Sequence, residues 1–472
     1  MGGWASIFNS TRDSLRFQTQ EIARLQEMAA TGSRVNRASD APTDAMRILQ
    51  YRSTANTLET YGKNLESVTD VREFAVTVFD TLSTSMARIR TLAAQAASGT
   101  YSARDRTPIA QEIDALLEQA VAFANTKDRG RYIFGGGSSE APYVVRRENG
   151  HIVGVDYVGG SQNLAVPVVA GVEYGTIFVG DKVFQSAGRK PPSFLGQTGT
   201  KPGTGTPSIR GDAWLAATHE STSYQGASGV AAGASSATGD TILGTHHTLT
   251  VDQPGHTLRL DQGAPVAFVG TEADLKLTNS SGDIVYVDTR GLQAGFQGTV
   301  QASATGRLSL DDGATLVPAA PGSNVAVTDS HTGAVLYVDT TAMDRVGLES
   351  VHVGGTYDVF NALISVRDAV MNSRDMSAAQ QTTLLENAMD ALTEATDGLT
   401  QATTSNGAQL QIMNSLEDST KNMAHNSQQQ ADALENADIT DVAADLARRQ
   451  VLYEMSLAIT SKLLSMSLLN YM

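Results

Sequence analysis

The chain has 472 residues, of which 43 are Gly, 12 are Pro and none is Cys, and this length allows roughly two to four domains. The absence of Cys excludes disulfides, thiolate metal sites and a cysteine nucleophile. The 34 basic and 50 acidic side chains give a net charge of −16, which argues against nucleic acid as a partner.

A helix with apolar side chains at seven-residue spacing is the first predicted element. Phe8, Leu15 and Ile22 recur at this interval and Leu25 adds a second position, so the helix carries a narrow apolar seam. Such a seam does not stabilise a helix on its own. Charged residues such as Arg12 interrupt this stretch, so we expect no cleaved secretion signal. No apolar run of about 18 residues occurs anywhere, so we expect no membrane insertion.

Two more helices are predicted in the N-terminal part. The heptad pattern stops at Gly32, and residues 39–42, Ser-Asp-Ala-Pro, predict an N-cap and then a Pro in the first turn of the next helix. Apolar heptads indicate a single helix over residues 42–97, roughly 80 Å long. Arg72 interrupts the apolar series and is expected to set the register of packing. A third helix follows, with Pro108 near its start.

The middle of the chain is rich in Gly and is predicted to be β structure, since 30 of the 43 Gly lie in residues 151–354. Alternating runs bounded by turn residues predict strands at Thr248–Asp252, Leu258–Asp261, Ile284–Asp288 and Val335–Asp339. The last two belong to a weak repeat displaced by 51 residues, which suggests a duplicated β unit. Residues 188–211, with four Pro and six Gly, are predicted to be a linker or long loop.

The C-terminal part mirrors the N-terminal part. Heptads from Leu385 to Met423 predict a rod-like helix of about 50 residues. The last helix opens at Asp438 and carries a second apolar seam, at Ile439, Val442, Leu446, Tyr453, Leu457, Leu464 and Leu468. The two terminal seams most simply bury against each other or against other subunits. The alternative is a pair of amphipathic helices packed on a large globular core.

The predicted fold is therefore α+β, a long coiled-coil-like helical bundle formed by both termini with a β-rich central insertion. We assign the terminal helices to residues 1–39 and 435–472, a rod domain of long helices to 40–142 and 355–434, and the Gly-rich insertion to 143–354.

Charge is unevenly distributed along the chain. Residues 1–150 hold 18 basic and 17 acidic side chains (+1), residues 151–354 hold 10 and 18 (−8), and residues 355–472 hold 6 and 15 (−9). The acidic surplus at the C-terminus is either a solvated helix face or a counterpart to the arginines of the N-terminal part.

Side chains suited to catalysis or metal binding form no convincing group. His246 and His247 are close to His256, but neighbours in a strand point to opposite faces, so we interpret them as exposed loop histidines. Residues 311–313, Asp-Asp-Gly, fit a β-turn better than a calcium loop, and residues 135–137, Gly-Gly-Gly, a turn better than a phosphate cradle. We predict no catalytic, cofactor-binding or metal-binding residue, no cofactor and no enzymatic activity.

Several segments resemble the bacterial flagellin superfamily. Residues 28–44, Met-Ala-Ala-Thr-Gly-Ser-Arg-Val-Asn-Arg-Ala-Ser-Asp-Ala-Pro-Thr-Asp, resemble the loop between the first two helices of flagellins and their relatives. Residues 123–136, Phe-Ala-Asn-Thr-Lys-Asp-Arg-Gly-Arg-Tyr-Ile-Phe-Gly-Gly, with Ala-Pro-Tyr at 141–143, are more similar to the hook-associated branch at the hook-filament junction. The C-terminal segments 450–458 and 467–472 are similar to that branch too.

This resemblance implies a structural subunit of the extracellular bacterial flagellum, exported through the flagellar type III channel without a cleaved signal. It implies that the terminal helices pair as a coiled coil in the core of a tubular assembly, with residues 32–40 as the joint to an outer shell. The implied assembly residues are Phe8, Leu15, Ile22, Leu25, Ile439, Val442, Leu446, Tyr453, Leu457, Leu464 and Leu468.

The implied partners are neighbouring copies of the chain, the hook-side junction protein, flagellin and an export chaperone. One alternative is a flagellin that forms the filament itself. An alternative of another class is surface adhesion or enzymatic activity in the insertion.

Overall fold

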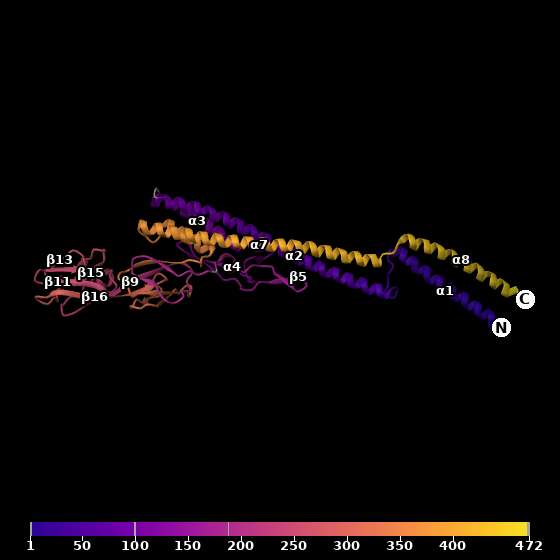
Figure 1. The fold of residues 1–472 in the computed structure, drawn as a ribbon, viewed down its shortest axis with the longest axis horizontal. Helices are drawn as coiled ribbons and strands as arrows, with labels where there is room; N and C mark the ends of the chain where they lie inside the picture. Colours follow the sequence, from indigo (N-terminus) through magenta and orange to yellow (C-terminus); the bar gives the residue numbers. More distant parts are fainter. Residues whose placement is uncertain (1, 99–100, 187, 470–472) are drawn as a thin grey trace. The chain divides into compact units, whose positions relative to one another are not determined.

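The computed structural model describes residues 2–98, 101–186 and 188–469, and the chain is α+β (Figure 1). Contacts divide it into two compact units. Unit 1 comprises residues 1–73, 165–176 and 408–472, and unit 2 comprises residues 74–164 and 177–407. The helices α2 (Pro42–Ala97) and α7 (Ala378–Glu435) contribute residues to both units. This division by contacts differs from the division by composition, which remains a prediction.

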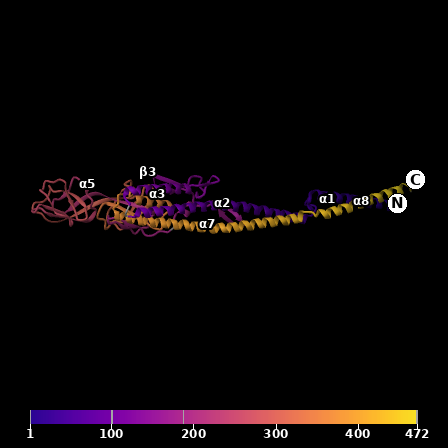
Figure 2. The same cartoon turned by 90° about the horizontal axis from the view of Figure 1, so that it is seen from above.

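Unit 1 contains the two terminal helices, α1 (Gly2–Thr31) and α8 (Ile439–Leu469). They lie side by side in both views and run antiparallel (Figures 1 and 2). Both helices form where the apolar seams predict them, and α2 also matches its predicted bounds, with Pro42 as its first residue.

The N-cap predicted within residues 39–42 is not formed by the Asp40 side chain. The Asp40 carboxylate accepts hydrogen bonds from the backbone N–H groups of Asn36 and Arg37, at 3.1 and 2.8 Å. Asp40 therefore stabilises the turn that precedes α2, because its side chain reaches back along the chain instead of forward into the helix.

A short hairpin completes unit 1. Its strands β5 (Ala165–Val169) and β6 (Val172–Gly175) pair antiparallel, and Val168 is fully buried with Leu65 of α2 and Met413 of α7. Arg72 is buried as well, at 7% exposure, and this burial lowers the pKa of its guanidinium, although the nearby Tyr174 phenol raises it. The residue that interrupts the heptads is thus enclosed in unit 1.

Unit 2 packs the helices α3 (Ala103–Ala124) and α6 (Val359–Met371) beside an aromatic cluster. The ring of Phe134 is fully buried, with its centroid 5.9, 5.8 and 4.8 Å from those of Phe79, Phe178 and Phe184. This cluster contains Phe134 of the segment 123–136. It gives unit 2 a core that closes within one chain.

The glycines that follow Phe134 form a turn, as predicted. Gly136 has φ +54°, and its N–H donates to the Phe178 carbonyl at 3.0 Å. A Cβ atom at this position would lie 1.8 Å from the Gly160 carbonyl oxygen, so only glycine permits this close approach.

The β part of unit 2 follows the predicted strands. The eight-stranded sheet has the order β13-β12-β11-β16-β9-β20-β7, with β17 paired to β16, and the smaller sheets have the orders β10-β15-β14, β18-β19-β8, β3-β4 and β1-β2. The strand bounds are β1 (Lys127–Asp128), β2 (Arg131–Tyr132), β3 (Tyr143–Glu148), β4 (His151–Tyr157), β7 (Ser193–Leu195), β8 (Lys201–Pro202), β9 (Gly211–Gln225), β10 (Ala231–Ala232), β11 (Gly244–Asp252), β12 (Thr257–Leu260), β13 (Val266–Ala267), β14 (Leu275–Thr278), β15 (Ile284–Asp288), β16 (Gln297–Ser309), β17 (Val317–Pro318), β18 (Val325–Thr328), β19 (Val335–Asp339) and β20 (Gly347–Val353), with short helices α4 (Gly180–Phe184) and α5 (Ser236–Gly239).

The sequence repeat corresponds to a structural repeat. The two copies form β15 and β19, and each is the second strand of an antiparallel hairpin, β14-β15 or β18-β19. Tyr286 and Tyr337 occupy the same place in these strands, and each ring packs against a glycine, Gly239 and Gly205 respectively. The prediction of a duplicated β unit is confirmed.

Two details of this region differ from the sequence predictions. Of the two alternatives for residues 188–211, the structure shows a long loop and not a linker. The loop contributes the short strands β7 and β8, and Thr198 donates its backbone N–H, at 2.7 Å, and its hydroxyl, at 2.6 Å, to the buried Glu349 carboxylate. His247 is not an exposed loop residue. It is buried in β11, with Nδ1 2.8 Å from the Asp261 carboxylate and Nε2 2.7 Å from the Asp344 carbonyl oxygen.

Candidate assembly interface

The α1–α8 pair has a small buried core near its joint with the long helices. Leu25 and Met28 of α1 and Val442 of α8 are each 6% exposed and form one cluster, with Leu446 and Ala437 packed against it. The structure therefore brings together three of the predicted assembly residues, Leu25, Val442 and Leu446. Their roles in assembly belong to the proposal below.

The other predicted residues are less enclosed. Leu15, Ile22 and Tyr453 are half-buried, whereas Ile439 and Leu457 are 49% and 43% exposed. The side chains of the remaining three predicted residues, Phe8, Leu464 and Leu468, lie outside the described set. Residues 470–472, the end of the segment 467–472, also lie outside it.

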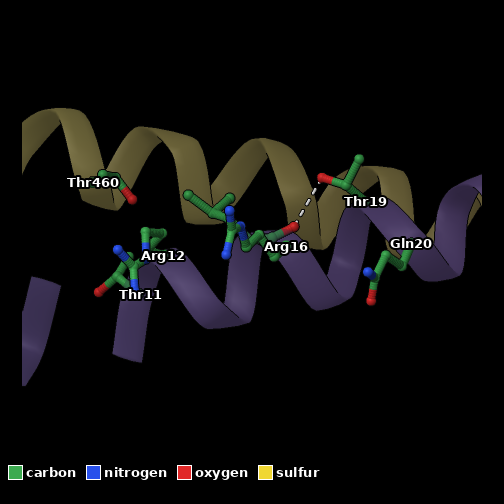
Figure 3. A pocket seen from close by; sticks show the side chains of 7 residues that line it. Thr11, Arg12, Arg16, Thr19, Gln20 and Thr460 are labelled. Atoms are coloured by element: carbon green, nitrogen blue, oxygen red, sulfur yellow. Dashed lines mark hydrogen bonds between the residues drawn. The ribbon is translucent and has the colours of Figure 1, made fainter. Parts of the chain in front are cut away.

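One side of the pair is hollowed into a groove (Figure 3). A hollow of about 670 Å³ is lined by Thr11, Arg12, Leu15, Arg16, Thr19, Gln20 and Thr460. A second hollow of about 420 Å³ is lined by Thr19, Ile22, Gln450, Tyr453 and Glu454. Because Thr19 lines both, the two hollows lie on the same side of α1, and we call this side the groove flank.

On the opposite side of the pair, Arg449 connects the two helices. The Arg449 guanidinium of α8 lies 3.6 Å from the Glu21 carboxylate and 6.0 Å from the ring centroid of Phe17. Phe17 is two residues from Leu15 and from Thr19, so it points about 200° away from these groove residues around α1. We call this side the Phe17 flank. Phe17 itself is 58% exposed there.

A second apolar face on α8 was missed by the sequence reasoning. Val451, Leu452, Met455 and Ile459 are 56%, 47%, 57% and 56% exposed. Val451 is nine residues from the buried Val442, which places it about 180° away around the helix. Val451, Met455 and Ile459 recur at intervals of four, a pattern that predicts an apolar helix face, but only the seven-residue spacing was used in the prediction.

Residues 32–40 are tied to the chain between α7 and α8. The Arg34 N–H donates to the Glu435 carbonyl at 2.6 Å, and the Ala437 N–H donates to the Gly32 carbonyl at 2.9 Å. The Arg34 guanidinium also donates to the Asp44 carboxylate at 2.8 Å and to the Leu434 carbonyl at 3.0 Å. This network connects the segment between α1 and α2 to the segment between α7 and α8.

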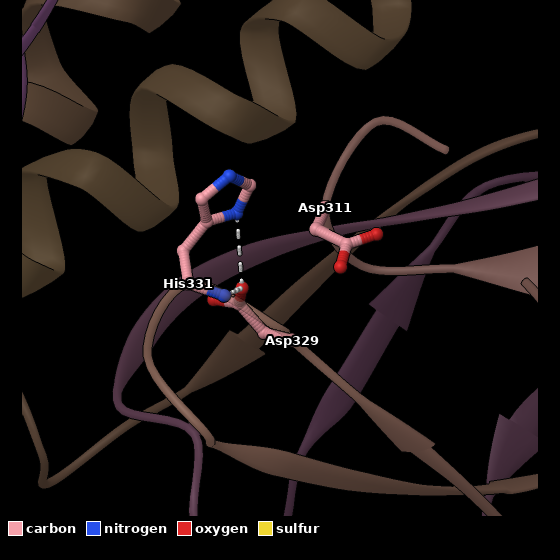
Figure 4. Close-up of side chains that lie close together, drawn as sticks. All are labelled: Asp311, Asp329 and His331. Carbon is pink, nitrogen blue, oxygen red and sulfur yellow. Dashed lines mark hydrogen bonds and ion pairs between the residues drawn. The ribbon is translucent and has the colours of Figure 1, made fainter. Parts of the chain in front are cut away.

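The described residues of the β region contain one group with possible metal-binding side chains, Asp311, Asp329 and His331 (Figure 4). The Asp311 oxygens already accept hydrogen bonds from Ser309, Thr315 and Ser330, at 2.6 to 3.0 Å. Although burial raises the pKa of Asp311, these hydrogen bonds hold it well below its usual value. The carboxylate stabilises a turn, and we assign no metal to it.

Comparison with known proteins gives matches to flagellar components. Residues 6–138 match the bacterial flagellin N-terminal helical region. Flagellar hook-associated protein 3 of Escherichia coli (strain K12) is 29% identical over 170 residues, which cover 35% of this chain and 51% of that protein. A flagellin of Listeria monocytogenes is 25% identical over 116 residues, which cover 25% of this chain and 40% of the flagellin.

The chain was also compared with solved structures. The flagellar hook associated protein-3 from Legionella pneumophila has a TM-score of 0.44 and 18% identity, covering 82% of this chain and 98% of that chain. The match to the curated E. coli relative spans about half of that relative's length. Among the described residues, no helix combines the length and the apolar character needed to cross a membrane.

Proposed function

We propose that this chain, whose residues 6–138 match the bacterial flagellin N-terminal helical region, is a non-enzymatic structural subunit that joins the flagellar hook to the filament. Its place is in the extracellular flagellum, reached by export without a cleaved signal. Its partners are neighbouring copies, the hook-side junction protein and flagellin, with an export chaperone before assembly. The observation that carries the proposal is the α1–α8 pair, which leaves its second apolar face uncovered.

Energy favours the covering of that face by other subunits. Complete burial of a large apolar side chain is worth about 1.5–3 kcal/mol. Four such side chains on α8 are about half exposed in the single chain, so a neighbour that covers them contributes several kcal/mol per subunit. Subunits of this kind gain stability by assembly, which suits a component of a polymeric structure.

The junction role rests on the segments that resemble the hook-associated branch and on the relative from E. coli. The match to its hook-associated protein 3 is longer and closer than the match to the Listeria flagellin, 29% over 170 residues against 25% over 116. Within the chain, Phe134 of the segment 123–136 lies in the aromatic cluster, and the Tyr143 ring meets Phe184 of this cluster edge-on, with centroids 5.8 Å apart. The second candidate is a filament-forming flagellin, which the Listeria match supports.

Immunogold labelling of flagella from the source bacterium separates these two functions. Antibodies raised against the β-rich insertion are expected to label a short zone between hook and filament. Label along the whole filament would favour the flagellin alternative, and intact flagella in a strain lacking this chain would contradict both. Antibodies against the bacterium's own filament protein provide the matched control.

A further inference from the structure

The groove flank of the α1–α8 pair carries two basic side chains, Arg12 and Arg16, and the described residues provide one carboxylate near the first and none near the second. Arg12 and Arg16 are one helical turn apart, are both exposed, and line the hollow shown in Figure 3. The nearest carboxylate to Arg12 is that of its neighbour Asp13, at 3.6 Å. Among the described side chains, no carboxylate is within ion-pair distance of Arg16. These two like charges therefore favour an acidic surface from outside the chain.

The Phe17 flank carries two acidic side chains with the same spacing. Asp441 and Asp445 are one turn apart on α8, and both are exposed. The Asp445 carboxylate also lies 3.8 Å from the exposed Arg448 guanidinium of the same helix, a solvated pair worth under about 1 kcal/mol that an ion pair with another copy can replace. Asp445 is four residues before Arg449, and Asp441 is four residues before Asp445, so the three lie along one side of the helix. Arg449 marks that side as the Phe17 flank through its contacts with Glu21 and Phe17.

These charges do not meet within one chain. Val442 packs against Leu25 and Met28, which sets Asp441 and Asp445 level with that part of α1. Arg12 and Arg16 are about 12 residues closer to the start of α1, and at about 1.5 Å per residue this is roughly 20 Å along the helix axis. Ion pairs between the two sets require two copies.

We propose that the groove flank of one copy receives the Phe17 flank of a second copy, displaced by roughly 20 Å along the helix axis. Because α1 and α8 run antiparallel, Arg12 of the first copy then pairs with Asp445 of the second, and Arg16 with Asp441. This inference rests on the proposed function, since it describes one contact within the assembly. The contact uses different surfaces on the two copies, so it continues from copy to copy instead of closing as a two-fold dimer.

Cysteine cross-linking tests this contact directly, because the chain has no Cys of its own. We expect full-length Arg16→Cys and Asp441→Cys chains, mixed and oxidised at an associating concentration, to form a disulfide-linked heterodimer. A disulfide needs Cα atoms about 4.4–6.8 Å apart, so the same two positions cannot be bridged within one chain. Each variant alone is the control, and a strong self-cross-link of either one would indicate two-fold packing and overturn the proposal.

Charge reversal provides the second measurement, by sedimentation of the full-length chain over a concentration series. The Arg12→Glu/Arg16→Glu variant and the Asp441→Arg/Asp445→Arg variant should each raise the concentration needed for association about tenfold, since two ion pairs become repulsive. The variant with all four changes should return to within about threefold of wild type, because the pairs re-form with exchanged signs. Arg90→Glu/Arg104→Glu, which reverses two exposed arginines of unit 2, is the matched control for net charge.

The possible outcomes separate the two proposals. A wild-type chain that stays monomeric at all concentrations contradicts the proposed self-assembly. Association that responds to the α1 and α8 reversals no more than to the unit 2 control contradicts the flank contact and leaves self-assembly intact. Failure of the fourfold variant to recover also contradicts the flank contact.

Discussion

The terminal helix pair of unit 1 and the aromatic cluster of unit 2 use apolar side chains in opposite ways. In unit 2, Phe134 and Phe360 are 0% and 1% exposed and pack among other rings of the same chain. In unit 1, α8 buries Val442 but leaves Met455 and Ile459 more than half exposed. The first region completes its core alone, and the second has apolar surface left for a neighbour.

Geometry explains the difference. Two helices can bury only the stripe that each turns toward the other, so a helix with apolar residues on two opposite sides needs a third partner. The rings of unit 2 come from a helix, a turn and a short helix that converge from different directions, and they enclose one another. The comparison predicts that a substitution in the α1–α8 pair impairs assembly, whereas a substitution in the aromatic cluster destabilises the fold of unit 2.

The largest expected effect is the loss of assembly when the terminal pair is broken. Leu446→Asp or Ile22→Asp places a charge in the α1–α8 contact, where it becomes desolvated only when the helices pair and assemble. We expect no association by sedimentation at any accessible concentration, with an unchanged near-UV circular dichroism signal from unit 2. Asn426→Asp on the exposed side of α7 is the control, and assembly of Leu446→Asp at wild-type concentration would show that the pair is not the core of the assembly.

The converse substitution is Phe134→Ala in unit 2. Removal of a buried ring that contacts three others should lower the free energy of unfolding of unit 2 by about 3–5 kcal/mol, seen as a lower midpoint in urea. Phe17→Ala removes an exposed ring from α1 and should leave that midpoint unchanged. Equal shifts for both variants would contradict the independence of the two regions.

Asp358 makes the stability of unit 2 depend on pH. Desolvation raises the pKa of this half-buried carboxyl to about 6, even though the Asn361 N–H donates to it at 2.6 Å at the start of α6 and lowers that pKa. A carboxyl with a raised folded-state pKa stabilises the fold below its unfolded value, and this contribution is lost as pH rises through 6. The shift corresponds to at most about 3 kcal/mol.

Replacing Asp358 with Asn tests this dependence. The Asn side chain keeps an oxygen that can accept the Asn361 hydrogen bond but has no charge to desolvate. Urea unfolding of unit 2 should therefore become less dependent on pH between 4 and 6. A wild-type stability that rises with pH over that interval would contradict the assignment.

The smallest expected effect is a modest weakening of the α1–α8 pair by salt. The ion pair between Arg449 and Glu21 is partly exposed, so it contributes under about 1 kcal/mol and is screened by salt. Raising the NaCl concentration should speed proteolytic cleavage within residues 1–40 and 435–472 modestly and leave cleavage in unit 2 unchanged. Arg449→Gln should remove most of the salt effect on the pair.

The regular elements of this chain could be predicted well because their patterns are local. Heptads and Pro42 define the start and length of α2, and alternating residues with turn signals define β15 and β19. The buried positions of Leu25 and Val442 followed from the same seams. Some differences concern contacts between distant residues, such as Thr198 with Glu349 and His247 with Asp261, which local composition does not encode. Others are local, because a side chain such as Asp40 can form its hydrogen bonds either backward or forward along the chain.

The sequence by itself determined the secondary structure, the α+β class and the presence of an apolar seam at each end, because propensity and periodicity act over a few neighbouring residues. Its net charge of −16 gave no indication of where the charges face. Only the tertiary structure decided that Arg12 and Arg16 lie on one flank of the pair and Asp441 and Asp445 on the other, since that depends on which helix faces turn toward each other. The same pairing decided which apolar residues of α8 remain exposed, and so which part of the chain is available for assembly.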